Sequence, residues 1–309
     1  MATKSQPAPQ TIVQLSRRFI VITTLVACFF LLLFNTAVWL NRYVMSTDKF
    51  SETALPALLS QSSTQAIASE VTDKLLEDRP VLKSTLNDRV VSLVAALLQT
   101  DLSERLVERS VRTLQISLTT ANPKVVAIDL SGIKNVVAQI LSLGRELTDR
   151  PVEEQRIDVD DVPDQIVIFD PSTLPSMYAV GLTALWLTPL ALLTVLGCLI
   201  YPLYRAYRIG VAELKRLLTI QGGAVVMTGL LALSLGPLVR PTVLAQVSSE
   251  NLRVVTENLL TAFLATFNEQ TVWLMLVPGL VMLLVALILH IWPWAMRTYR
   301  NRSSNTLKL

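Results

Sequence analysis

The chain has 309 residues, of which 51% are hydrophobic and 17% are charged. Because a soluble domain carries about 25% charged residues, this composition argues against an ordinary soluble protein. The formal net charge is only +3, and many basic residues cluster beside long apolar segments. That arrangement indicates membrane topology signals and contacts with anionic lipid rather than nucleic-acid binding.

Four segments contain no Asp, Glu, Lys or Arg. They are residues 19–40, 178–204, 217–239 and 271–296. A helix needs about 20 residues to cross a bilayer, so each segment is predicted to be a transmembrane helix. Ion and proton pathways usually carry ionisable side chains at membrane depth. The spans therefore argue against ion transport by this chain alone.

The segments outside the spans differ sharply in charge. The tails 1–18 and 297–309 and the loop 205–216 together hold 11 basic residues and one acidic residue. Residues 41–177 hold 14 basic and 20 acidic residues, and residues 240–270 hold two and three. Because short basic segments stay in the cytoplasm during insertion, both termini and the loop 205–216 are predicted to be cytoplasmic. Residues 41–177 and 240–270 are then extracytoplasmic, on the outer side of the cell membrane.

The first span contains a motif similar to a lipoprotein signal. Arg17 and Arg18 precede an apolar run that includes Leu25-Val26-Ala27-Cys28. The apolar part of a signal peptide has about 7–15 residues, whereas this run continues to Leu40. We therefore expect an uncleaved signal-anchor helix.

Residues 41–177 are predicted to be mostly helical, because capping residues repeatedly precede apolar residues at helical spacing. The expected starts are Ser46, Thr47 and Asp48 for a helix over 49–59, Ser62 with Gln65 for a helix to 77, Pro80 for a helix over 81–99, and Asp101 with Glu104 for a fourth helix.

After Pro123 the pattern changes. Two short runs rich in β-branched residues, 125–130 and 166–169, favour a pair of strands, with a helix near 131–147 between them. The expected fold class is a mainly α membrane protein. It has four transmembrane helices, a mostly helical extracytoplasmic domain and a candidate two-stranded β element.

An acidic run over residues 158–164 is the one candidate metal site. Its carboxylates belong to Asp158, Asp160, Asp161 and Asp164. Calcium prefers carboxylate oxygens at alternating loop positions, but a calcium loop also has a glycine for its sharp turn and an acid further downstream. This run has neither, so we favour a solvated acidic loop and expect no cofactor.

Common catalytic and zinc sites lack their residues in 41–177. The single histidine, His290, lies near the end of the last span with no acid beside it in the sequence, which favours interfacial packing over general-base catalysis. Cys28 and Cys198 both lie in spans, so neither a Cys-His pair nor a zinc site is expected in that domain. Gly222-Gly223 lies in the third span, where small residues permit close helix packing.

A weak internal repeat links two parts of the chain. Residues 71–76 (VTDKLL) and 255–260 (VTENLL) are identical at four of six positions. Each segment follows an outward-going span. The chain is therefore either two similar hairpins, the first enlarged by an insertion, or two amphipathic helices that match by chance. A true repeat predicts that 63–77 and 247–260 are helices packed side by side.

The residues after the first span carry a resemblance to a known family. Asn41-Arg42-Tyr43-Val44-Met45-Ser46-Thr47-Asp48-Lys49-Phe50 is similar to the Asn-Arg-x-Val-x-x-Thr-Asp-x-(Phe/Tyr) motif of uncharacterised bacterial four-span membrane proteins with a large extracytoplasmic domain. The resemblance covers 41–76 and the order of the spans. It implies a membrane location and this topology, and it brings no assigned activity.

The motif residues themselves suggest a structural role. Arg42 is expected to extend to the lipid headgroups, and Thr47 or Asp48 to cap the next helix. We therefore interpret Asn41, Arg42, Thr47 and Asp48 as a juxtamembrane structural motif rather than a ligand site.

Three classes of function remain. We expect a non-enzymatic protein of the bacterial cell membrane whose extracytoplasmic domain binds a protein partner or scaffolds an assembly. The alternative is an accessory subunit of a transporter, with the conducting part elsewhere. The third class, a membrane enzyme acting through carboxylates such as those in 158–164, is disfavoured by the missing His and Cys chemistry.

Overall fold

The computed structural model describes residues 15–75, 88, 91–92, 94–96, 100–121, 126–129, 165–169, 177–247 and 249–306. These residues belong to two compact units. The first unit is drawn from 1–37, 186–235 and 268–309, and the second from 38–185 and 236–267.

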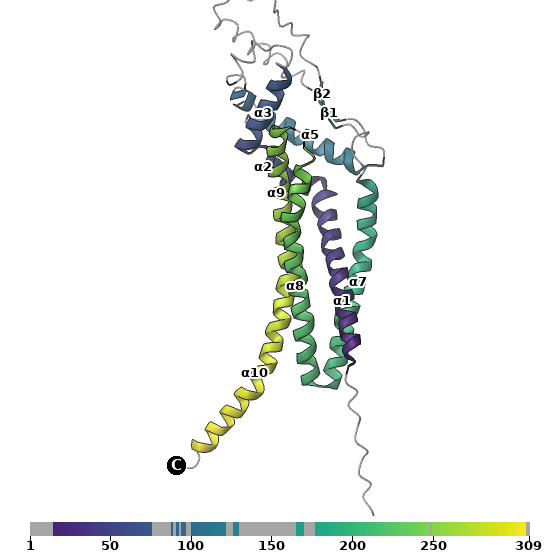
Figure 1. The fold of residues 1–309 in the computed structure, drawn as a ribbon, viewed down its shortest axis with the longest axis vertical. Helices are drawn as coiled ribbons and strands as arrows, with labels where there is room; N and C mark the ends of the chain where they lie inside the picture. The colour runs from purple at the N-terminus through teal and green to yellow at the C-terminus, as the bar shows by residue number, and fades with distance from the viewer. Residues whose placement is uncertain are drawn as a thin grey trace, which may run out of the picture. The chain divides into compact units, whose positions relative to one another are not determined.

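Four helical segments are long and apolar enough to cross a membrane, which confirms the four predicted spans. The first is α1 (Arg17–Trp39), continued by the π-helical turn η1 (Leu40–Val44). The second and third are α7 (Tyr178–Ile209) and α8 (Val211–Leu244). The fourth is α9 (Glu250–Thr271), the π-helical turn η3 (Val272–Leu276) and α10 (Val277–Thr306), which follow one another directly (Figure 1).

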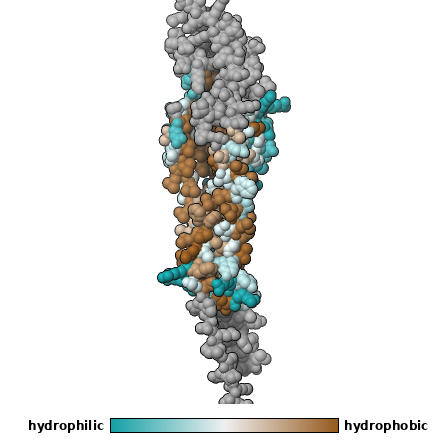
Figure 2. All heavy atoms as spheres, turned by 90° about the vertical axis from the view of Figure 1, so that its right-hand side faces the viewer, coloured by the Kyte–Doolittle hydropathy of each residue, from teal (hydrophilic) through white to brown (hydrophobic). Residues whose placement is uncertain are grey.

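Large apolar side chains on these helices face outward. Trp186 is 73% exposed, Leu193 69% and Leu238 66%. Hydrophobic residues accordingly cover much of the coloured surface in Figure 2, with hydrophilic residues gathered near its ends. Water-soluble monomers rarely expose apolar patches of this extent. The surface is that of a multi-pass membrane protein.

The segment 205–216, predicted to connect the second and third spans, is helical except at Gly210. Helix α7 continues to Ile209 and α8 begins at Val211, so only Gly210 separates them. Gly210 has φ +145°, a conformation that glycine adopts without a steric penalty. Ala206 of this segment and Leu217, directly after it, are buried in a small core with Leu15 and Ile20.

Helices α8 and α10 approach each other closely at glycines. A Cβ atom on Gly222 would lie 3.0 Å from the carbonyl oxygen of Gly279, and one on Gly279 would lie 2.8 Å from Val226 Cγ2. The neighbouring Gly223 has nothing within 4 Å of its own Cβ position. The packing role predicted for Gly222-Gly223 is therefore confirmed for Gly222 alone.

This difference gives a matched pair of substitutions. Gly222→Ala has to push the backbone of α10 away, and overpacking of this kind costs about 1–3 kcal/mol. Gly223→Ala adds a methyl group to open space and should leave stability unchanged or slightly improved. Thermal unfolding of both variants in detergent measures the contrast, and equal melting temperatures would contradict the close α8–α10 contact.

The second unit contains three further helices and a small sheet. The helices are α2 (Thr47–Leu58), α3 (Gln61–Leu75) and α5 (Asp101–Thr119). Strands β1 (Val126–Asp129) and β2 (Gln165–Phe169) pair antiparallel, with Ile128 opposite Ile166, as the β-branched runs predicted. Of the helix expected over 81–99, residues 88, 91–92 and 94–96 are described and are helical. The helix expected near 131–147 lies outside the described residues.

The helix caps follow the sequence prediction only in part. Ser46 caps α2, because its Oγ accepts a hydrogen bond from the backbone N–H of Lys49 at 3.5 Å. The cap of α3 is Ser60 rather than Ser62, since Ser60 Oγ accepts from the N–H of Ser63 at 3.3 Å. Asp101 is the first residue of α5 and not its cap, which is Thr100. Neighbouring serines offer equivalent caps, and tertiary packing selects one of them.

Helices α3 and α9 pack side by side and run antiparallel. Asn258 Nδ2 donates to Ser62 Oγ at 2.9 Å and to Ser63 Oγ at 2.8 Å. Further along, Asn251 Nδ2 donates to Ser69 Oγ at 3.3 Å. The side-by-side helices that the internal repeat predicts are therefore present, while the repeat itself stays a prediction.

Candidate functional site

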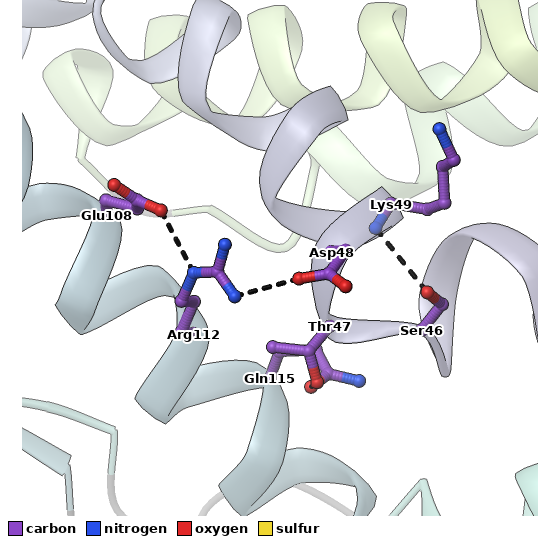
Figure 3. A network of polar contacts seen from close by, with 7 residues as sticks. All are labelled: Ser46, Thr47, Asp48, Lys49, Glu108, Arg112 and Gln115. Atoms are coloured by element: carbon purple, nitrogen blue, oxygen red, sulfur yellow. Dashed lines mark hydrogen bonds and ion pairs between the residues drawn. The ribbon is translucent and has the colours of Figure 1, made fainter.

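Polar side chains of α2 and α5 form a network directly after the first span. We call it the α2–α5 network; its members are Ser46, Thr47, Asp48, Lys49, Glu108, Arg112 and Gln115 (Figure 3). The first four belong to the juxtamembrane motif of the sequence, and the last three to α5. The network lies entirely within the second unit.

Gln115 forms the centre of this network. It is 1% exposed, and its Nε2 donates to the carbonyl oxygens of Val44 at 3.1 Å and Met45 at 2.9 Å. Its Oε1 accepts from Thr47 Oγ1 at 2.8 Å. The carbonyls at the end of a helix have no partner within the helix. The amide of Gln115 supplies that partner at the end of η1, and every polar group of its side chain is engaged.

Arg112 adds a charged link at the surface. Its Nη1 donates to Asp48 Oδ1 at 2.9 Å and its Nε to Glu108 Oε1 at 3.0 Å. The hydrogen bond to Asp48, and then that to Glu108, raises the pKa of the Arg112 guanidinium above its ordinary value. The Asp48 side chain is 75% exposed, so solvent screens this pair. The Arg112–Asp48 ion pair links α5 to α2 and adds little to the folding stability.

Helix α5 also contacts the beginning of α7. The N–H of Met177 donates to the carbonyl of Leu118 at 3.0 Å. Close to it, Met45 packs on Gly181, where a Cβ atom would lie only 2.6 Å from the Met45 sulfur. One amphipathic helix thus ties the end of the first span to the start of the second.

Aromatic residues join the end of α1 to α9 in the same unit. Trp39 Nε1 donates to Thr266 Oγ1 at 3.0 Å, and its ring lies edge-on to Phe267 with the centroids 5.6 Å apart. Phe263 contacts both Trp39 and Phe50, with centroid distances of 6.4 and 5.2 Å. Edge-on aromatic pairs add stability beyond their burial. The first span therefore meets two helices, α5 and α9, through specific contacts.

The residues singled out in the sequence have different outcomes. Thr47 and Asp48 belong to the α2–α5 network. Asn41 and Arg42 lie earlier, in η1, where the Arg42 guanidinium carbon is 5.4 Å from the ring centroid of Tyr43. The structure thus brings half of the predicted motif together with α5.

Sequence reasoning missed Glu108, Arg112 and Gln115. A usable signal was present, because Gln115 lies four residues after the buried Val111, on the face of α5 that should be apolar. A polar side chain on a core-facing position needs a hydrogen-bond partner.

The predicted metal residues Asp158, Asp160, Asp161 and Asp164 lie outside the described residues. Among the residues that the structure describes, no three His, Cys, Asp or Glu side chains are close enough to hold a metal ion. His290 lies in α10, and its Nδ1 is 3.0 Å from Lys215 Nζ of α8. It joins two helices of the first unit through that hydrogen bond.

No protein-family model, curated protein or solved structure matches this chain.

Replacing Gln115 tests the central role of its amide. Gln115→Leu keeps the volume and removes three hydrogen bonds, leaving two carbonyls and a hydroxyl without their partner. Stranding buried polar groups costs about 2–3 kcal/mol in total here. Thr113→Ala is the control, since Thr113 Oγ1 is exposed and bonds only within its own helix to Arg109 O. Thermal unfolding in detergent compares the two, and equal melting temperatures would refute the assignment.

Proposed function

We propose that the chain is a non-enzymatic four-span protein of the bacterial cell membrane. Residues 41–177 and 240–270 form its extracytoplasmic part, which acts as a binding or scaffold module. The charge distribution supports this topology, because 11 basic residues and one acidic residue flank the spans on the proposed inner side. The resemblance of residues 41–76 to bacterial four-span proteins agrees with it.

The observation that carries the proposal is the set of buried hydrogen bonds around Gln115 in the second unit. Flexible tethers are rich in glycine and serine and make few contacts. Here Gln115 bonds to the end of η1, and Leu118 to the start of α7. A set of helices joined by buried hydrogen bonds to η1 and to the start of α7, all within the second unit, is suited to presenting a surface to a partner.

Topology is tested first with single cysteines. In a chain with Cys28 and Cys198 replaced by alanine, Glu52→Cys places a thiol on α2, where the glutamate side chain is 62% exposed. Val211→Cys places one at the turn beside Gly210, where the valine is 59% exposed. A membrane-impermeant maleimide should label the first variant in intact cells and the second only after permeabilisation. The opposite pattern would overturn the proposed orientation.

Partner binding is tested by affinity purification in mild detergent after crosslinking in cells. A photo-crosslinking amino acid at position 52 should capture a specific protein, and the same group at Trp186, an exposed residue of α7, is the control for lipid-facing contacts. Recovery of a transporter as a stoichiometric partner would favour the accessory-subunit function. Equal capture patterns at the two positions would contradict a binding module.

A further inference from the structure

The fourth apolar segment is interrupted by the π-helical turn η3. The N–H of Val277 donates to the carbonyl of Val272, five residues earlier rather than four. The next residue, Pro278, explains the position of this turn. Proline has no N–H, and its ring collides with the carbonyl four residues before it in an ordinary helix. The wider turn over Val272–Leu276 makes room for that ring.

Three buried polar residues of the first unit surround the start of η3. Asn35 and Thr271 are fully buried, and Gln270 is 7% exposed. Gln270 Nε2 donates to the main-chain oxygen of Asn35 at 2.8 Å and to its Oδ1 at 3.1 Å. Asn35 Nδ2 in turn donates to Thr271 Oγ1 at 2.9 Å. We call these three residues the latch. They join α1 to the last residues of α9 at the point where the turn begins.

The opposite side of η3 is held by α8. Met275 is fully buried, and a Cβ atom on Gly229 would lie 3.1 Å from Met275 Cβ and 2.8 Å from Leu276 Cδ2. The wide turn therefore presses on a position where only a glycine leaves room. Helix α1 thus contacts the two residues just before η3, and helix α8 contacts η3 itself.

The helical register decides whether the latch can exist. One residue of an α-helix corresponds to a rotation of about 100° and a rise of about 1.5 Å. Conversion of η3 to an ordinary α turn removes one residue from the wide turn. Gln270 and Thr271 then rotate by about 100° relative to α10, and they can no longer both face Asn35. The hydrogen bonds of the latch are compatible with only one of the two registers.

We propose that η3 is a two-register switch in the fourth segment, and that the latch Asn35–Gln270–Thr271 selects its π register. Release of the latch lets the turn change register and rotates the end of α9 against α10. This inference does not depend on what the extracytoplasmic part binds. π-Helical turns inside α-helices are frequent at functional sites. In this one, breaking the hydrogen bonds of the latch is the event that allows the change of register.

Hydrogen–deuterium exchange of the full chain in detergent tests the switch. Gln270→Met nearly keeps the side-chain volume and Asn35→Leu keeps the branched shape, and each removes hydrogen bonds of the latch. Peptides covering residues 268–278 should then exchange faster, by roughly three- to tenfold for each hydrogen bond lost. Thr271→Val removes a single bond and gives a milder variant in case the others do not fold.

Gln221→Leu is the matched control. Gln221 is a fully buried amide of the same unit, away from η3, with one long hydrogen bond of 3.4 Å to the carbonyl of Cys198. Its replacement should leave exchange at 268–278 unchanged. Unchanged exchange in every latch variant, or equal acceleration in Gln221→Leu, would overturn the proposal.

Deletion of Leu274 separates a switch from a simple structural bond. The π turn holds one residue more than an α turn. Its deletion therefore gives a continuous α-helix that leaves Gln270 and Thr271 facing Asn35, and the latch forms but no second register is available. In the deletion chain, Gln270→Met should accelerate exchange at 268–278 much less than in the full chain, because only the hydrogen bonds of the latch are lost. If the substitution has the same effect with and without Leu274, the latch and the register are independent, and the proposal is wrong.

Discussion

In the hydrocarbon of a bilayer, a backbone N–H or C=O group finds hydrogen-bond partners only within the protein. Most of the described chain meets this constraint with uninterrupted α-helix. At η1 and η3 the helix widens. The buried Gln115 contacts the end of η1, and the buried Gln270 lies two residues before η3. Gln115 binds the carbonyls of Val44 and Met45, and Gln270 binds the carbonyl of Asn35. Each glutamine donates to a backbone carbonyl of the first span or of the turn that follows it, in different units of the molecule.

Polar side chains and close packing determine which helices meet, because apolar side chains distinguish poorly between a neighbouring helix and lipid. In lipid, leucine gains little by contacting another helix instead of an acyl chain, so close packing and hydrogen bonds determine which helices meet. The contact of Gly222 with Gly279 and the bond between Lys215 and His290 join α8 to α10 in these two ways. The remaining surface of α7 and α8 exposes many leucines.

The sequence was informative where one physical signal dominated. The absence of charges over residues 19–40 and the three later spans predicted four apolar helices, and two short runs rich in β-branched residues predicted the pairing of β1 with β2. It failed where several residues could serve equally, as at Ser60 and Ser62, or where long-range packing decides. Gln115 and Gln270 form hydrogen bonds with residues 70 and 235 positions away in the sequence, and no local sequence pattern indicates such partners.

The single-residue turn at Gly210 has a consequence for biosynthesis. Helices α7 and α8 form a hairpin whose arms are already bonded near the turn, from Gln221 to the carbonyl of Cys198. With no spacer between the arms, we expect α7 and α8 to enter the bilayer together as a helical hairpin. An insertion at this turn would disturb the order of membrane integration before it disturbed the finished fold.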